Sequence, residues 1–470
     1  MNIKTIRKIH FTGIKGVGMA ALAILAKDLK IKVTGSDVPD SFVTEQALKK
    51  AGIRYKEKFS ADYVKRVRPD LLVYTGAHFN KKEVIAARQL KIATLSHGEA
   101  LGLFMKGKKA ISVCGVGGKT TTSAMIATVL TKANFHPSFA VGVADIPCLG
   151  TPAGYDKKGN WFVAEADEYI HSPNDKTPKF LAQNPEVAVL TNLAFDHPDV
   201  YPNFLKTKKA FKKFLKLVPE NGLFVTCFDN KNNQKLLKEI ENSRATYGFS
   251  PEADWQITRF YQAEGKAFFS VKYQQIDFGE FILNVPGRFN ALNATASLAV
   301  GHFLGADIKR IRQGLEAFTG TKRRFEKIAQ EGSTFLYDDY AHHPLEIRAT
   351  LKAAKEFWPD KKIIAIFQPH TFSRTKALFA EFAKSFEDAD LAILTDIYAS
   401  AREKQDSTIS GKKLAKQTQK HHPEVYFLPG KDKVVEFLSE KNLQDTVIFT
   451  MGAGDVYLWH KNILRMLKER

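Results

Sequence analysis

Short apolar runs that end in glycine or small polar residues recur along the chain, and they predict the buried strands of parallel sheets. Apolar residues at helical spacing follow several of these runs. Through the first two thirds of the chain the predicted strands lie at 9–12, 71–74, 110–114, 161–165 and 187–190. Strands that alternate with helices in this way indicate an α/β fold.

The last third of the chain repeats this alternation. Its predicted strands are 335–340, 363–367, 391–397 and 447–454, and its predicted helices are 344–358 and 379–389. A chain of 470 residues is long enough for roughly three domains. We therefore expect a three-domain α/β protein, with a Rossmann-like N-terminal domain (1–106), a central P-loop ATPase-type parallel-sheet domain (107–320) and a Rossmann-like C-terminal domain (321–470).

The turn after the predicted strand 110–114 has the pattern of a phosphate-binding loop. It reads Gly115-Val116-Gly117-Gly118-Lys119-Thr120, and a helix is predicted from Thr121 onward. Glycines let backbone N–H groups approach phosphate oxygens, and the start of a helix adds partial positive charge. In such loops the lysine reaches the outer phosphates and the following hydroxyl holds Mg²⁺. The alternative is an ordinary glycine-rich turn with an incidental lysine.

A second glycine turn lies near the N-terminus. Gly13, Gly16 and Gly18 follow the first predicted strand, and Ser36 and Asp37 follow the second one, at 31–34. An acid about 20 residues beyond a glycine turn suits a Rossmann-like half that binds a nucleotide. Taken alone, this turn would also allow a nicotinamide-dependent oxidoreductase, which would leave the lysine of the other loop without a function.

Acids and a histidine follow the predicted strands beside the phosphate-binding loop. Glu165, and after it Glu168, are candidate Mg²⁺ ligands, because carboxylates at such strand ends belong where Mg²⁺ is held. His197 is a candidate ligand of a second divalent ion, with a capping or loop histidine as the alternative. Asn290 and Asn293 lie at a predicted helix start, where their amides suit an adenine edge or, for Asn290, a helix cap.

Beyond residue 318 the candidates are mostly basic side chains and imidazole rings. Arg324 lies in the basic run 322–325, and it would either reach a phosphate or remain a solvated linker charge. At the ends of the predicted strands of the last domain lie further candidates, namely Asp339, Tyr340, His342, His343, His370, Ser373 and Arg374. Ligands of open parallel sheets bind at the carboxyl ends of strands, so these clusters predict a further substrate site. His342 and His370 are candidate general bases by position alone.

The net charge of +20 allows a nucleic-acid partner as one interpretation. The basic residues are spread along the chain and mixed with acids, so we predict no nucleic-acid partner, and a P-loop NTPase that acts on one stays the alternative. No apolar run approaches the ~20 residues of a membrane span, so no membrane insertion is expected. Three separated cysteines indicate neither a disulfide framework nor a zinc site and favour the cytoplasm.

Taken in order, these motifs resemble those of the Mur ligase family along nearly the whole chain. The matching segments are HFTGIKGVGM (10–19), GVGGKTTT (115–122), EADE (165–168), TNLAFDHPDVY (191–201), PGRFNALN (286–293), KRRF (322–325), DDYAHHPLEI (338–347), FQPHTFSRT (367–375), DIYASARE (396–403) and MGAGD (451–455). Each segment is moderately specific, and their order and spacing together are highly specific. The resemblance is greatest to the alanine-adding branch, while a murein-tripeptide recycling branch shares several segments.

The resemblance implies an ATP-dependent ligase that joins L-alanine to the lactyl carboxylate of UDP-N-acetylmuramate through an acyl phosphate, in peptidoglycan precursor synthesis, with ATP and Mg²⁺. In the first domain, the UDP-sugar would be held by Gly13, Gly16, Gly18, Ser36 and Asp37. In the central domain, ATP would be held by Gly115, Gly117, Gly118, Lys119, Thr120, Thr121, Asn290 and Asn293, and metal by Thr120, Glu165 and His197. Arg324 and Asp339 would reach ATP, and the amino acid would be surrounded by Tyr340, His342, His370 and Arg374. Catalysis would rest on Lys119, Glu165, His197 and His342.

Three positions depart from the family's usual pattern. Gly117 stands where GTHGKT loops carry histidine, Phe289 replaces a histidine before the first asparagine, and Thr371 replaces an arginine of some relatives. The last change leaves recognition of the amino-acid carboxylate mainly to Arg374. The first raises a noncatalytic sugar-nucleotide binding module as an alternative. Sites on three separate domains suggest closure about a hinge near 320–325, in a monomer or weak homodimer.

Overall fold

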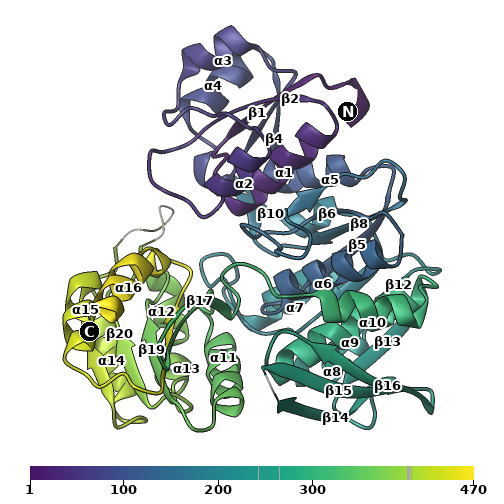
Figure 1. Cartoon of the computed structure of the whole chain (residues 1–470). Coiled ribbons are helices and arrows are strands. Elements are labelled where there is room, and N and C mark those ends of the chain that lie inside the picture. Colours follow the sequence, from purple (N-terminus) through teal and green to yellow (C-terminus); the bar gives the residue numbers. More distant parts are fainter. Residues whose placement is uncertain (242, 264, 400–402, 404, 470) are drawn as a thin grey trace.

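The computed structural model describes residues 1–469 apart from 242, 264, 400–402 and 404, so part of the 396–403 segment lies outside the described residues. The chain forms three α/β units, each built around its own main sheet (Figure 1). The N-terminal unit lies at the top of Figure 1, the C-terminal unit at the lower left, and the middle unit joins them on the right. The expected three-domain α/β fold is confirmed.

The first unit is a four-stranded parallel sheet with the order β2-β1-β3-β4. Its strands are β1 (Lys8–Thr12), β2 (Lys32–Ser36), β3 (Leu71–Tyr74) and β4 (Ala93–Ser96). Its helices are α1 (Val17–Asp28), α2 (Glu45–Lys50), α3 (Ala61–Val67), α4 (Lys82–Gln89) and α5 (His97–Met105), with the 3₁₀ turns η1 (Ile3–Thr5) and η2 (Gly76–His78). Helix α1 starts directly after the glycine turn and is buried from 19 to 26, because a helix that is apolar all round must be covered on every side.

The middle unit is a ten-stranded sheet with the order β16-β15-β14-β13-β12-β11-β5-β8-β6-β7. Its strands are β5 (Lys109–Cys114), β6 (Ser138–Ala140), β7 (Ala153–Gly154), β8 (Trp161–Glu165), β11 (Pro185–Leu190), β12 (Leu223–Cys227), β13 (Arg244–Gly248), β14 (Trp255–Ala263), β15 (Lys266–Tyr273) and β16 (Ile276–Leu283). A separate hairpin contains β9 (Ile170–Ser172) and β10 (Asp175–Pro178). The strands from β14 to β6 run parallel, as expected for a parallel-sheet domain.

An antiparallel extension of this sheet was missed by the sequence reasoning. Strands β14, β15 and β16 form a meander, and β7 pairs antiparallel with β6 at the other edge. The signal was present in β15, where Ala267, Phe269 and Val271 are buried and alternate with half-buried positions. That two-residue period is typical of a strand with one face on a core.

The helices of the middle unit are α6 (Lys119–Lys132), α7 (Phe204–Leu215), α8 (Lys231–Leu237), α9 (Arg288–Phe303) and α10 (Ile308–Ala317), with the 3₁₀ turn η3 (Lys179–Ala182). Helix α6 is buried from 120 to 130 and packs against α9 and α10. It begins at Lys119 rather than at Thr121. The lysine and threonine of the phosphate-binding loop therefore belong to the first turn of a buried helix.

The C-terminal unit is a six-stranded sheet with the order β17-β18-β22-β19-β20-β21, parallel except for the edge strand β17. Its strands are β17 (Glu326–Glu331), β18 (Thr334–Asp339), β19 (Lys362–Phe367), β20 (Leu391–Leu394), β21 (Val425–Phe427) and β22 (Thr446–Met451). Its helices are α11 (Pro344–Phe357), α12 (Phe372–Ala377), α13 (Phe379–Ala383), α14 (Gly411–Thr418), α15 (Gly430–Ser439) and α16 (His460–Lys468), with η4 (Val456–Trp459).

The helix expected at 379–389 is wrong in its second half. Helix α13 ends at Ala383, and the hydroxyl of Ser385 donates to the carbonyl of Glu381 at 2.7 Å. Side-chain bonds of this kind compete with the hydrogen bonds of a helix, so an apolar pattern alone overestimates its length.

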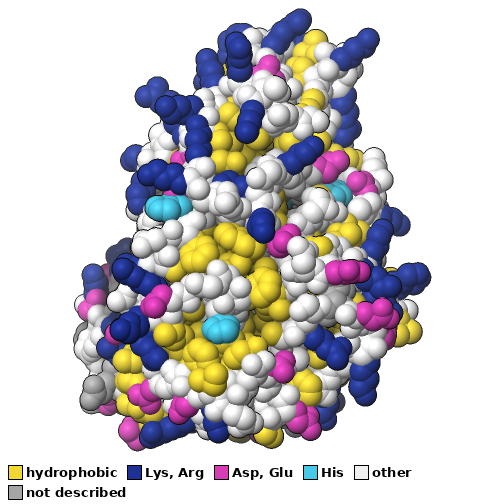
Figure 2. All heavy atoms as spheres, turned by 90° about the vertical axis from the view of Figure 1, so that its right-hand side faces the viewer, with side chains coloured by type: hydrophobic (Ala, Val, Ile, Leu, Met, Phe, Trp, Pro, Cys, Tyr) yellow, Lys and Arg dark blue, Asp and Glu magenta, His cyan; other side chains and the backbone are white. Residues whose placement is uncertain are grey.

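Charged side chains are dispersed over the surface. On the face shown in Figure 2, Lys and Arg extend from top to bottom, and Asp and Glu lie among them. On that face the acidic side chains accompany the basic ones mainly in the middle and lower parts, and basic side chains predominate at the top. Across the described residues, no helix combines the length and the apolar character needed to cross a bilayer. Cys114, Cys148 and Cys227 are all free thiols.

Candidate active site between the three domains

The phosphate-binding loop forms the turn between β5 and α6. Gly115 has a φ of +133°, and a β-carbon there would lie 2.1 Å from Oγ1 of Thr191, so the position requires glycine. The residues after β11 support the loop. Oδ1 of Asn192 accepts hydrogen bonds from the backbone N–H groups of Val116 at 3.0 Å and Gly117 at 2.9 Å. The sequence reasoning included Asn192 in a motif but missed this supporting contact.

The ammonium group of Lys119 is bound by protein oxygens. Its Nζ lies 2.9 and 3.1 Å from the two carboxylate oxygens of Glu168 and donates to the carbonyl of Gly115 at 2.5 Å. Burial lowers the pKa of Lys119, but Glu168 and Asp167 outweigh burial and raise that pKa above its usual value. The lysine is therefore a permanent cation at the start of α6.

Glu165 ends β8 and faces the first turn of α6. Its carboxylate accepts the hydroxyl of Thr120 at 3.0 Å and the backbone N–H of Gly142 at 2.6 Å. Burial raises the pKa of Glu165 above its usual value, although these donors and Lys119 oppose the shift. The hydroxyl and the carboxylate that were expected to share a metal thus contact each other.

His197 lies beside a different pair of carboxylates. Its Nε2 is 3.4 Å from Oε1 of Glu168 and 3.7 Å from Oδ2 of Asp196. Burial lowers the pKa of His197, and the two carboxylates raise it by more, so the net shift is upward. Glu168, which the sequence ranked second to Glu165, therefore links Lys119 and His197.

The three expected metal ligands are not gathered into one preformed group. Thr120 contacts Glu165, whereas His197 contacts Glu168. Within the part of the chain that the structure describes, no cluster of three or more His, Cys, Asp or Glu side chains is arranged to hold a metal ion. Further ligands would have to come from a bound molecule.

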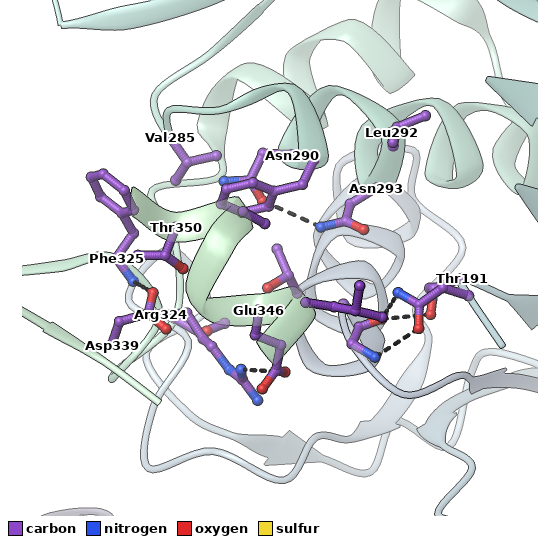
Figure 3. Close-up of a pocket in the computed structure, with 18 of the residues that line it drawn as sticks. Thr191, Val285, Asn290, Leu292, Asn293, Arg324, Phe325, Asp339, Glu346 and Thr350 are labelled. Atoms are coloured by element: carbon purple, nitrogen blue, oxygen red, sulfur yellow. Dashed lines mark hydrogen bonds and ion pairs between the residues drawn. The ribbon is translucent and has the colours of Figure 1, made fainter. Parts of the chain in front are cut away.

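A cavity of about 150 Å³ lies between the phosphate-binding loop, α9, the 318–325 segment and α11 (Figure 3). Its walls are largely apolar and include Val285, Phe289, Leu292, Phe318 and Phe325. The amides of Asn290 and Asn293 face it from α9, in the upper part of Figure 3. Apolar walls with a few placed polar groups are typical of a small-molecule site.

The helix-cap alternative for Asn290 is wrong. Gly287 is the N-cap of α9 and makes no side-chain cap, while Nδ2 of Asn290 donates backwards to the carbonyl of Pro286 at 2.7 Å. Nδ2 of Asn293 donates to Oδ1 of Asn290 at 3.3 Å, and its Oδ1 accepts the hydroxyl of Thr122 on α6 at 3.1 Å. The two amides therefore tie α9 to the helix that carries the phosphate-binding loop.

The 318–325 segment brings Arg324 to the loop from the C-terminal side. Its guanidinium lies 3.4 Å from Oε1 of Glu346 and 4.9 Å from the ring centre of Tyr340. Burial raises the pKa of Glu346, but His342 and Arg324 more than reverse this effect and lower that pKa to about 2. Arg323 and Phe325, on either side of Arg324, have φ of +62° and +51°, so the segment holds strained backbone where closure was expected.

Glu346 was missed by the sequence reasoning, although it lies in a quoted motif. It caps α11 by accepting the backbone N–H groups of His342 at 3.1 Å and His343 at 3.3 Å. A β-carbon on Gly117 would lie 3.4 Å from Cγ of Glu346, so this side chain of the C-terminal domain reaches the phosphate-binding loop. Glycine in place of the family's histidine leaves room for that approach.

Asp339 is the last residue of β18, and His342 lies three residues later in the segment before α11. Asp339 accepts the backbone N–H groups of Phe325 at 2.9 Å and Ala341 at 2.7 Å, and burial raises its pKa to about 6. Nδ1 of His342 lies 2.9 Å from the carbonyl of Tyr340, and burial lowers its pKa to about 4. The imidazole is therefore neutral at pH 7, with its proton on Nδ1 and Nε2 able to accept one.

Arg374 joins the C-terminal and middle domains. It donates from Nε to Oδ1 of Asp196 at 2.8 Å and from Nη2 to Oδ2 at 3.3 Å. His370 lies alongside, with its Nδ1 3.4 Å from Nη1 of Arg374 and its ring 6.4 Å from that of His342. The structure thus brings the expected amino-acid residues together, and it shows that the guanidinium already holds a carboxylate.

The expected sugar-nucleotide residues surround the turn between β1 and α1. Gly13 has a φ of +85°, and Gly16 is the N-cap of α1. A β-carbon on Gly18 would lie 2.4 Å from Nε2 of His97, a residue of α5 that was not predicted. Asp37 does not present a free carboxylate, since it accepts the backbone N–H groups of Lys15 at 2.6 Å and Val38 at 2.8 Å. Ser36 is fully buried and donates to Glu83.

These separate pieces open onto one cleft of about 420 Å³. From the N-terminal domain it is lined by Gly16, Gly18 and His97; from the middle domain by Lys119, Thr120, Glu165 and His197; and from the C-terminal side by Arg324, Tyr340, His342 and Glu346. A volume of this size is in the range of small-molecule sites, roughly 300–1,000 Å³.

Family models describe almost the whole chain. The model of the Mur ligase family, catalytic domain, matches residues 8–109, that of the Mur ligase middle domain matches 113–301, and that of the Mur ligase, glutamate ligase domain, matches 323–454. The chain belongs to the Mur ligase family. The resemblance seen in the sequence is thereby confirmed.

Two curated relatives and two solved structures show which members this Mur ligase is similar to. The UDP-N-acetylmuramate–L-alanine ligase of Caldanaerobacter subterraneus subsp. tengcongensis is 40% identical over 97% of both chains, and that of Acetivibrio thermocellus is 39% identical over 96% of this chain and 94% of its own. The structure of UDP-N-acetylmuramate-alanine ligase from Thermotoga maritima matches with a TM-score of 0.81 at 28% identity, covering 98% and 99% of the two chains. A murein peptide ligase from Psychrobacter arcticus matches with a TM-score of 0.73 at 25% identity, each chain being covered to 99%.

Proposed function

We propose that this Mur ligase joins L-alanine to the lactyl carboxylate of UDP-N-acetylmuramate in an ATP-dependent reaction, as a step of peptidoglycan precursor synthesis. The observation that carries the proposal is the single cleft onto which the phosphate-binding loop, the N-terminal glycine turn and the His342 region all open. A ligase of two substrates and ATP needs three such regions, whereas a simple NTPase needs one. The names of the relatives supply the substrates.

Each domain takes one ligand in this proposal. Residues 1–106 bind the UDP-sugar, 107–320 bind ATP, and 321–470 bind the amino acid and close over ATP. The first boundary is supported by its place between α5 and β5, and the second by its place between α10 and β17. The protein acts in the cytoplasm as a monomer or weak homodimer.

ATP is assigned to the cavity of Figure 3 and the adjoining loop. The adenine would lie between the apolar walls with its edge at Asn290 and Asn293, and the phosphates would run over Gly115, Gly117 and Gly118 towards Lys119. Thr120 and Thr121 lie in the first turn of the helix whose N-terminal dipole favours the negative charge. Arg324 and Asp339 complete the site from the hinge and β18.

The residues present fit Mg²⁺ when phosphates accompany it. Mg²⁺ in such sites is bound by one or two carboxylates or hydroxyls together with substrate phosphates and water, so a preformed protein cage is not required. Thr120 and Glu165, 3.0 Å apart, and His197 are the residues that would hold it. Bound there, the ion supplies charge that offsets the phosphates and polarises a phosphoryl oxygen.

The first chemical step is attack of the lactyl carboxylate on the γ-phosphate, which gives an acyl phosphate and ADP. Two unit negative charges ~4 Å apart repel by ~1 kcal/mol in water but by ~4 kcal/mol at an effective dielectric of ~20. Lys119 and Arg324, both permanent cations, offset this repulsion from either side of the loop.

Both cations are held by carboxylates of the protein. Glu168 binds Lys119, and Glu346 binds Arg324. A triphosphate offers oxygen atoms of the same kind, so ATP would replace these partners without leaving the cations unpaired at any stage. These ion pairs compensate two buried positive charges.

The second step is attack of the α-amine of L-alanine on the acyl phosphate, with release of phosphate. Arg374 is assigned to the amino-acid carboxylate, with Tyr340, His342 and His370 around it. Neutral His342 can accept the proton of the amine at Nε2. Closure of the C-terminal domain about 320–325 would exclude water that otherwise hydrolyses the acyl phosphate.

The test is phosphate release from purified protein with ATP, Mg²⁺ and UDP-N-acetylmuramate, comparing L-alanine, glycine, L-serine and the cell-wall tripeptide as acceptors. Release that requires both the sugar nucleotide and L-alanine is expected. A preference for the tripeptide would assign the chain to murein recycling instead. Release that needs neither substrate would contradict the ligase and favour another class of NTPase.

A further inference from the structure

A fully buried carboxylate lies beneath the glycine turn of the N-terminal domain. Glu83, the second residue of α4, has no exposed surface, and neither have His10, Thr12 and Ser36 around it. Its Oε2 accepts the hydroxyls of Thr12, at 2.9 Å, and of Ser36, and it lies 3.2 Å from Nε2 of His10. Its Oε1 accepts the backbone N–H of Ser60 at 3.0 Å.

The two hydroxyl donors end neighbouring strands, and the binding loops start immediately after them. Thr12 is the last residue of β1 and precedes Gly13, while Ser36 is the last residue of β2 and precedes Asp37. The backbone carbonyl of Ser36 accepts the N–H of Gly13 at 2.8 Å. Glu83 therefore joins, through one oxygen atom, the two strand ends on which the turn is built.

The charge of Glu83 matters as well as its shape. Burial raises the pKa of a carboxyl, but here the hydrogen bonds from His10 and Ser36 outweigh burial and hold the pKa of Glu83 below its usual value. The side chain stays ionised across neutral pH and can accept from all four donors at once. A buried polar network in which every member is satisfied makes the local geometry rigid.

We propose that Glu83 is a positioning residue of the sugar-nucleotide site, which fixes the 13–18 turn and the 36–37 loop in the geometry that receives the diphosphate. The inference rests on the proposed function, in which this turn binds the UDP-sugar. Backbone N–H groups bind a phosphate well only when they are held in place before the ligand arrives, because a displacement of about 1 Å is costly in such sites. Asp37 adds a second link between the two loops, because its carboxylate accepts the backbone N–H of Lys15 at 2.6 Å.

The experiment compares Glu83→Gln with the wild-type protein. Glutamine keeps the shape but removes the charge and replaces one acceptor by a donor that faces hydroxyl groups. We expect the KM for UDP-N-acetylmuramate to rise by about 10–100-fold, while kcat and the KM values for ATP and L-alanine change little. Calorimetric titration with UDP-N-acetylmuramate alone should show the same loss of affinity.

Asp70→Asn is the matched control. Its carboxylate accepts the backbone N–H groups of Arg7 at 2.8 Å and Lys8 at 2.9 Å, at the opposite end of β1 in the same sheet. Loosening the sheet in general would affect both variants alike, so Asp70→Asn should lower the thermal midpoint and leave the sugar KM unchanged. The proposal would be overturned if Glu83→Gln had the wild-type KM for UDP-N-acetylmuramate. It would also be overturned if this KM rose equally in Asp70→Asn.

Thr12→Val keeps the proposal testable if Glu83→Gln does not fold. It removes one of the four donors and leaves the carboxylate in place, so a smaller rise in the same KM is expected. An unchanged KM in a folded Thr12→Val protein would count against the proposal. Failure of the wild-type protein to bind UDP-N-acetylmuramate would contradict the proposed function itself, and the two failures are distinguished by that titration.

Discussion

Arg374 of α12 donates to both carboxylate oxygens of Asp196, at 2.8 Å from Nε and at 3.3 Å from Nη2. The two side chains belong to different domains and are 6% and 4% exposed. Burial raises the pKa of Asp196, but His197 and Arg374 more than reverse this effect and hold that pKa well below its usual range. The pair is therefore an ionised, two-point link between the C-terminal and middle domains.

Replacing Arg374 by lysine should raise the KM for L-alanine by about 10-fold or more, because an ammonium cannot make the planar two-point contact of a guanidinium. Arg374→Ala should raise it further, while the KM for ATP changes less. Steady-state kinetics with each substrate varied in turn checks this expectation. A loss confined to ATP in both variants would move Arg374 out of the amino-acid site.

Lys119→Ala should abolish formation of the acyl phosphate while UDP-N-acetylmuramate still binds. The lysine is assigned to the triphosphate alone, and its removal also leaves the buried Glu168 without its nearest cation. Isotope exchange or hydroxylamine trapping measures the first property, and calorimetry measures the second. Lys132→Ala, at the exposed C-terminal end of the same helix, is the control and should retain full turnover. Undiminished turnover in Lys119→Ala would refute the assignment of the loop.

Local chemistry explains which features the sequence predicted. Gly115, Lys119 and Thr120 belong to a turn whose geometry is set by residues adjacent in the sequence. The sequence pattern alone was therefore enough to place it between β5 and α6. The strand ends of the C-terminal domain were placed in the same way, because parallel strands bring their carboxyl ends to one edge.

Contacts between segments far apart in the sequence were beyond that reasoning. Glu168 with Lys119 and Glu346 with Arg324 each join two segments of one domain, whereas Asp196 with Arg374 joins the middle and C-terminal domains. No local pattern exists for such pairs. The antiparallel meander β14–β16 was missed although the alternation was visible in β15, because Gln274 and Gln275, which form the positive-φ turn between β15 and β16, are not the glycine or asparagine that usually marks such a turn.

His460 should make the protein less stable at low pH. It begins α16, its Nε2 lies 2.7 Å from the hydroxyl of Thr450, and burial lowers its pKa to about 4. Between that value and the ordinary pKa of about 6.5, the unfolded chain binds more protons than the folded one, so the free energy of unfolding falls as the pH is lowered. The contribution of this group between pH 7 and 5 is about 2 kcal/mol.

His460→Gln removes this titration, so its thermal midpoint relative to wild type should improve as the pH is lowered from 7 to 5. Thermal unfolding of both proteins at the two pH values gives the comparison. If the thermal midpoints of the two proteins differ by the same amount at pH 7 and at pH 5, His460 is not buried in its neutral form.

Two alanine substitutions in the phosphate-binding loop should have opposite outcomes. Gly115 has a φ of +133°, and an added β-carbon would lie 2.1 Å from Oγ1 of Thr191, which itself donates to the carbonyl of Gly117 at 2.6 Å. A β-carbon on Gly117 would meet Cγ of Glu346 and Nδ2 of Asn192 only at 3.4 and 3.5 Å. Gly115→Ala must distort the loop, whereas Gly117→Ala adds contacts at nearly ordinary separation.

We therefore expect Gly115→Ala to weaken ADP binding by roughly 30–150-fold, the equivalent of about 2–3 kcal/mol of strain, and Gly117→Ala to bind ADP nearly as well as wild type. Calorimetric titration with ADP measures both. Equal losses in the two variants would mean that the loop cannot accept any side chain, and that Glu346 is held too firmly to adjust. Retained binding in Gly115→Ala would contradict the placement of the phosphates over this loop.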